Sequence, residues 1–148
     1  MRNIIQIKGK VASGGGKATG NFKNVKELIG ERTGLPALED GTLNVQMEKH
    51  FPITAVTGVI TNDEYKREQE CIKLRRCRVR KAGENKSVKA VIVRPSQHED
   101  PDGRPTLWRR IELMSDQNLR QNLSLTDDDE VEIEVEKETV VDEDWWNA

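Results

Sequence analysis

Two short stretches of the chain carry side chains whose types and spacing suit the binding of phosphate groups. The first, residues 13–20 (SGGGKATG), contains four glycines together with Lys17 and Thr19. Backbone N–H groups without Cβ atoms beside them can converge on an anion. The spacing differs from a Walker A loop, because Lys17 is followed by Ala18. The stretch is a candidate phosphate cradle, and a flexible hairpin connection is the alternative.

The second stretch, residues 41–44 (GTLN), is a candidate magnesium site. In a strand, alternate residues point to the same face, so Thr42 and Asn44 should lie on one side and Leu43 on the other. A hydroxyl and an amide oxygen suit a Mg²⁺ ion that keeps waters and phosphate oxygens as its other ligands. The alternative is structural, because Thr is common in strands and Asn in turns.

The elements that must position these residues are mostly short strands. Alternating or β-branched apolar residues predict strands near residues 5–11, 42–47, 56–60, 72–79, 88–93, 107–113 and 130–136, the third being the weakest. The apolar phase slips by one residue across Arg75 and Arg76, which predicts a β-bulge. With no βαβ alternation, we expect an all-β fold, a small closed barrel of about six strands.

Two short helices are also expected. Asn24 is a candidate cap for a helix that Gly34 and Pro36 would end, and Ser115 is a candidate cap for a helix over residues 116–122. Residues 62–64 read as a turn.

Composition limits the remaining possibilities. The 148 residues suit one domain, with 24 Lys and Arg against 26 Asp and Glu, so no overall positive charge is available to hold nucleic acid. Cys71 and Cys77 form no zinc-ligand set, and the chain has neither an apolar secretory signal nor a run long enough to span a bilayer. We expect a cytoplasmic protein with reduced thiols, independent of membranes.

The end of the chain is strongly acidic. We expect a domain over residues 1–137 and a flexible tail over residues 138–148. Trp145 and Trp146 in this tail suggest either a frayed end, which is favoured slightly, or a segment that docks on a partner.

Three motifs carry a resemblance to a known family. The segments SGGGKATG (13–20), GTLNVQM (41–47) and RIELMSDQNLRQNLSLTDDDEVEIEV (110–135) follow one another in the order and at the distances found in archaeal CTP-dependent riboflavin kinases. The resemblance extends from about Gly9 to Val135. It implies a cradle-loop β-barrel that moves the γ-phosphate of CTP to riboflavin and yields FMN and CDP with Mg²⁺, and we expect a monomer.

The resemblance also implies roles for single residues. Thr42 and Asn44 would hold Mg²⁺, Glu112 would meet the flavin, and Glu112 and Lys17 would take part in catalysis. The nucleotide would contact Gly15, Gly16, Lys17, Ala18, Thr19, Gly20, Gln117, Asn118, Leu119 and Arg120.

The chain departs from the family pattern in three places. Its glycine loop is one residue longer, with Lys17 where the family has an acidic residue. His98 stands where the family has a flavin-contacting Thr, and we assign His98 to the flavin as well. An insertion through residues 102–104 follows.

Two other functions stay open. The basic strand at residues 73–81 and the ending LTDDDEVEIEV resemble parts of swapped-hairpin DNA-binding barrels, although nucleic acid ranks second because a cationic strand face is usually just solvated. A family member that binds nucleotide or flavin without catalysis is the other alternative.

Overall fold

The computed structural model describes residues 4–12, 25–39, 41–49, 57–65, 71–96, 109–136 and 143–148. The strands are β1 (Ile4–Ala12), β2 (Leu43–Met47), β3 (Gly58–Ile60), β4 (Ile72–Lys81), β5 (Ser87–Pro95), β6 (Arg110–Met114) and β7 (Glu130–Glu136). The helices are α2 (Lys26–Thr33), α3 (Asn62–Tyr65), α5 (Leu119–Asn122) and α6 (Glu143–Trp146). Within these ranges, no helix has the length and apolar character needed to cross a membrane.

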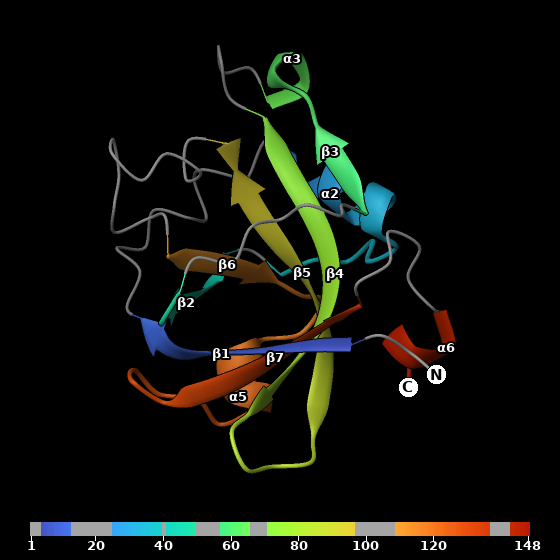
Figure 1. Ribbon diagram of the computed structural model, residues 1–148. Coiled ribbons are helices and arrows are strands. Elements are labelled where there is room, and N and C mark those ends of the chain that lie inside the picture. The colour runs from blue at the N-terminus through green and yellow to red at the C-terminus, as the bar shows by residue number, and fades with distance from the viewer. Residues whose placement is uncertain are drawn as a thin grey trace.

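The described strands close into a ring. Antiparallel pairing runs in the order β4, β5, β6, β2, β1, β7, and β7 pairs back onto β4. The predicted all-β barrel of six strands is therefore confirmed. The additional strand β3 pairs only with β4, and Figure 1 shows it with α2 and α3 beyond the ring at one end of β4.

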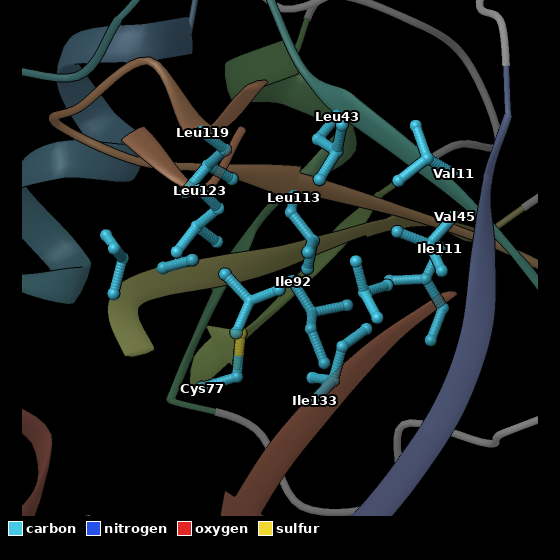
Figure 2. Packing of buried hydrophobic residues seen from close by; sticks show 14 of the residues in the cluster. Val11, Leu43, Val45, Cys77, Ile92, Ile111, Leu113, Leu119, Leu123 and Ile133 are labelled. Carbon is cyan, nitrogen blue, oxygen red and sulfur yellow. The ribbon is translucent and has the colours of Figure 1, made fainter. Parts of the chain in front are cut away.

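Two apolar cores lie on opposite faces of the sheet. Inside the barrel, alternate residues of the six ring strands pack together with Leu119, Leu123 and Leu125, as Figure 2 shows for ten labelled side chains. Outside the barrel, α2, β3 and α6 cover a second core against β4 and β5. Strands β4 and β5 therefore have apolar residues on both faces, while β1 and β7 expose charged side chains outward.

The predicted bulge in β4 is wrong. Pairing with β5 is unbroken from Ile72 opposite Pro95 to Arg80 opposite Ser87. The apolar phase changes because the strand passes from one core to the other: Leu74 packs in the outer core, and Cys77 packs inside the barrel.

Helix boundaries are partly as predicted. Gly34 ends α2 in the left-handed conformation at φ 81°, and its N–H donates to Gly30 O. The N-cap position of α2 is Val25 rather than Asn24, and α5 is capped by Asn118 rather than Ser115. Residues 62–65 form one helical turn, α3, where a simple turn was expected.

The last six residues pack against the barrel. Trp145 and Trp146 are 7% and 1% exposed and belong to the outer core. The Trp146 indole Nε1 donates to Cys77 O at 3.1 Å, and the Arg76 guanidinium lies 4.3 Å from the ring centroid. The expectation of a frayed end is wrong for residues 143–148, because the two large aromatic side chains are buried.

Candidate functional site

The predicted metal ligands and Glu112 lie together on the outer face of two paired strands. Asn44 of β2 stands opposite Glu112 of β6. The neighbouring pair, Leu43 and Leu113, faces the barrel interior. Thr42, one residue before β2, donates a hydrogen bond from Oγ1 to Glu112 Oε1 at 3.2 Å. The sequence predicted that Thr42 and Asn44 lie on the same side of the strand. The pairing of β2 with β6 places the Glu112 carboxylate next to them.

The environment of Glu112 raises the pKa of its carboxyl. Its side chain is 7% exposed, and burial raises the pKa of the carboxyl, while the Thr42 hydrogen bond and the charges of Arg110 and Arg94 lower it. Burial is the largest effect, so the pKa lies above the ordinary value of 4.5. A carboxylate with a raised pKa accepts a proton more readily than an ordinary one.

A small polar pocket begins beside Thr42. It has a volume of about 160 Å³, and its lining joins Thr42 to Gln117, Asn118, Leu119 and Arg120. Gly41, also in the lining, supplies the turn before β2 with a φ of 86°. The fold thus brings residues that lie about 75 positions apart in the chain into one pocket.

The four residues at 117–120 have different local surroundings. Asn118 Oδ1 accepts from Gln121 N at 3.1 Å and caps α5, while Gln117 Oε1 accepts from the Asn122 side chain. Leu119 packs mainly into the barrel core. Arg120 donates to Asp127 Oδ1 at 2.8 Å and is partly exposed. Gln117 and Arg120 therefore present the polar groups of this turn to the pocket.

The last described residue before the glycine loop lies beside these residues. Ala12, the last described residue before it, pairs with Asn44, and its carbonyl lies 3.5 Å from Arg120 Nη2. The predicted residues Gly15, Gly16, Lys17, Ala18, Thr19, Gly20 and His98 lie outside the described ranges.

The oxygen donors fit a Mg²⁺ ion that shares its ligands with a nucleotide. Thr42 and Asn44 supply a hydroxyl and an amide oxygen, and the Glu112 carboxylate lies beside them. The described ranges contain no group of three His, Cys, Asp or Glu side chains placed to hold a metal. An ion at Thr42 and Asn44 would therefore depend on further oxygens from a bound phosphate.

Two residues support the site in ways that the sequence analysis did not predict. Ser115 Oγ donates to Lys89 O at 2.9 Å, and Ser115 O accepts from Glu39 N at 2.8 Å, which fixes the turn after β6. Arg94 is buried near Glu112 and donates to Arg110 O. Ser115 was predicted only as a helix cap. Arg94, a charged residue at the end of the β-branched run before Pro95, was a signal that could have been used.

Arginines of the predicted basic strand, which is part of β4, form ion pairs and hydrogen bonds with other parts of the protein. On β4, Arg80 pairs with Glu132 and Glu134 of β7 at 2.8 and 2.9 Å. Arg78 donates to Ser87 Oγ at 2.9 Å and to the backbone of the C-terminal helix, and Arg76 pairs with Glu143. Three of the side chains that suggested a nucleic-acid surface, Arg76, Arg78 and Arg80, are thus held by contacts within the protein.

The fold and site together define a closed β-barrel with hydroxyl, amide and carboxylate oxygens at the mouth of a small polar pocket. Residues 11–135 match the model of the CTP-dep_RFKase family, which is described as a domain of unknown function, DUF120. The chain therefore belongs to this family, whose name indicates CTP-dependent riboflavin kinases. No curated protein matches the chain.

Proposed function

We propose that this protein is a CTP-dependent riboflavin kinase, which converts riboflavin and CTP into FMN and CDP. The observation that carries the proposal is the contact between Thr42 and Glu112 at the edge of the pocket formed by residues 117–120. It joins a candidate phosphate and metal site to a candidate base, and the family match supports the choice of substrates.

The base of the nucleotide would occupy the small pocket. A volume of about 160 Å³ is below the usual range of about 300–1,000 Å³ for whole ligands, so it suits one ring rather than a complete nucleotide. The phosphates would extend toward residues 13–20, where Gly15, Gly16, Ala18, Thr19 and Gly20 would offer backbone N–H groups and Lys17 a positive charge.

Thr42 and Asn44 would hold the Mg²⁺ ion of the nucleotide. When bound, Mg²⁺ neutralises negative charge on the phosphate oxygens. The Thr42 hydroxyl already donates its proton to Glu112, which leaves its oxygen lone pairs available to a cation.

Glu112 would take the proton of the attacking hydroxyl. The ribityl hydroxyl oxygen forms a bond to the γ-phosphorus, the bond from that phosphorus to the β–γ bridging oxygen breaks, and CDP leaves. The hydroxyl proton passes to the Glu112 carboxylate, whose burial raises its pKa. No covalent enzyme intermediate is needed, because phosphoryl transfer depends mainly on positioning and charge neutralisation.

The test is FMN formation with each of the four nucleoside triphosphates, riboflavin and Mg²⁺, followed by chromatography and flavin fluorescence. We expect FMN with CTP as the preferred donor. Thr42→Ala and Asn44→Ala should both lower the rate sharply and raise the Mg²⁺ concentration for half-maximal activity, while Glu84→Gln, in the exposed β4–β5 turn, should behave as the unchanged protein. Absence of FMN with every donor would refute the proposal.

A further inference from the structure

Helix α6 is held on the barrel by contacts of several kinds. Trp146 is buried in the outer core, and Glu143 forms an ion pair with Arg76. Asn147, just after the helix, accepts a hydrogen bond at Oδ1 from Lys89 Nζ at 2.7 Å. The family match ends before this helix begins. The helix is therefore a packed element beyond the matched part of the chain, and its contacts lead toward the small polar pocket.

Lys89 of β5 connects α6 to one wall of that pocket. Its Nζ lies 5.0 Å from the centroid of the Trp146 ring, a cation–π contact. Its backbone O accepts from Ser115 Oγ at 2.9 Å, and Ser115 Oγ in turn accepts from Gln117 N at 3.3 Å. Both Ser115 and Gln117 line the pocket. One lysine thus contacts α6 through its side chain and supports the pocket wall through its backbone.

The segment after α2 connects α6 to the same wall by a second route. Trp146 and Leu38 belong to the same outer core. The residue after Leu38 is Glu39, which lines the pocket and donates from its backbone N–H to Ser115 O at 2.8 Å. The two routes therefore meet at Ser115, where Lys89 fixes the hydroxyl and Glu39 fixes the carbonyl.

This arrangement makes the shape of the pocket wall depend on a distant helix. Figure 1 shows α6 and β2 on opposite sides of the barrel, so a direct contact of α6 with a ligand in the pocket is not part of the argument. Ser115 is 3% exposed, and its position is fixed by the contacts described above. A wall that is held in place before a ligand arrives costs less ordering when the ligand binds.

We propose that α6 is a positioning element for the nucleotide pocket, whose docking on the barrel holds Ser115 and Glu39 in place for CTP. The proposal rests on the proposed kinase function, since it concerns the nucleotide side of the same site. Undocking of α6 weakens CTP binding. Because coupling between two sites is reciprocal, bound CTP must also favour the docked helix.

The first test needs no variant. Hydrogen–deuterium exchange, read by mass spectrometry, follows the amides of residues 143–148 in the unchanged protein with and without CTP and Mg²⁺. We expect saturating CTP to slow their exchange about fivefold, as for an ordinary coupling between two sites. The amides of the exposed turn at residues 83–86 serve as the control and should exchange equally in both states. Equal exchange of residues 143–148 with and without bound CTP would overturn the inference.

The second test measures CTP binding separately from turnover. Isothermal titration calorimetry with Mg²⁺ gives the Kd for CTP of the unchanged protein, Glu143→Lys and the control Glu84→Lys. Glu143→Lys places two positive charges together at Arg76, whereas Glu84→Lys makes the same change of net charge in the exposed β4–β5 turn. We expect Glu143→Lys to raise the Kd about fivefold and the control to bind as the unchanged protein does. A positioning role also predicts that kcat at saturating CTP changes by less than about twofold.

A double-mutant cycle tests whether α6 acts through Ser115. Ser115→Ala removes the hydroxyl that joins Lys89 O to Gln117 N, so it should raise the Kd for CTP by itself. Combined with Glu143→Lys, it should raise the Kd by less than the product of the two single effects, because both changes loosen the same wall. Effects that multiply fully would overturn the assignment of Ser115 as the point where α6 acts.

The outcomes separate this inference from the kinase proposal. Faster exchange of residues 143–148 in a folded Glu143→Lys variant, checked by circular dichroism, with an unchanged Kd for CTP would overturn the inference and leave the kinase proposal standing. CTP binding that depends on Glu143, together with no FMN from any triphosphate, would support the inference and refute the kinase.

Discussion

Thr42 and Glu112 are 70 residues apart in the chain, yet the Thr42 hydroxyl donates to the Glu112 carboxylate at 3.2 Å. The contact exists because β2 and β6 are neighbours in the ring and because Asn44 pairs with Glu112. It couples a candidate Mg²⁺ ligand to a candidate base, and the first prediction follows from it.

Replacing Glu112 by Gln should lower kcat with little change in the KM for CTP. The amide has nearly the same shape but cannot accept the hydroxyl proton, so we expect a loss of about 10²–10⁴-fold in kcat, the usual contribution of a general base. Steady-state FMN formation measures the effect, with Glu84→Gln as the control. A kcat within about threefold of the unchanged protein would show that Glu112 is not the base.

Replacing Trp146 by Ala should strongly destabilise the fold. The side chain is 1% exposed, packs in the outer core and donates to Cys77 O, so its loss leaves a cavity and removes a hydrogen bond. We expect a decrease of about 3–5 kcal/mol in the free energy of unfolding, measured by urea denaturation. The control Val59→Ala, at an exposed site, should cost less than about 0.5 kcal/mol. Equal stability of the two variants would contradict the packing of α6.

The Arg32–Glu64 ion pair should make stability depend on pH in the acid range. Arg32 Nη1 donates to Glu64 Oε1 at 2.7 Å, and this hydrogen bond, with that from Thr61 N, lowers the pKa of Glu64 from 4.5 to about 2. A lowered pKa in the folded state means that the contribution is complete above pH 4.5 and disappears as the pH falls toward 2.

The measurement compares melting temperatures of the unchanged protein and Glu64→Gln between pH 7 and pH 2. We expect the unchanged protein to melt higher near neutrality and the difference to shrink below about pH 4.5. Glu84→Gln serves as the matched control. A difference that stays constant across this range would mean that the pair does not form in the folded protein.

The two thiols should differ sharply in reactivity. Cys77 is buried in the barrel core, and burial raises the pKa of its thiol, whereas Cys71 is partly exposed. With a thiol-specific chromogenic disulfide at pH 8, a Cys71→Ala variant should react only after denaturation, while Cys77→Ala should react in the native state. Rapid native labelling of Cys77 would show that the barrel opens readily.

Several features of this protein could be predicted from the sequence because they depend on neighbouring residues. Alternation of apolar residues placed the strands, Gly34 ended α2, and a two-residue spacing put Thr42 and Asn44 on one side. The one-residue slip at Arg75 and Arg76 was misread, because local pattern cannot distinguish a bulge from a strand that is covered by different cores on its two faces.

The sequence by itself determined the all-β class, most strands and the shared side of Thr42 and Asn44, since each follows from the period of a strand. Only the tertiary structure decided that β7 closes the ring on β4, that Arg80 of β4 meets Glu132 and Glu134 of β7, and that Trp146 is buried. It also decided that Thr42 contacts Glu112. The physical reason is that periodicity fixes which face of a strand is apolar, whereas the partner of each face is chosen by pairings between distant segments.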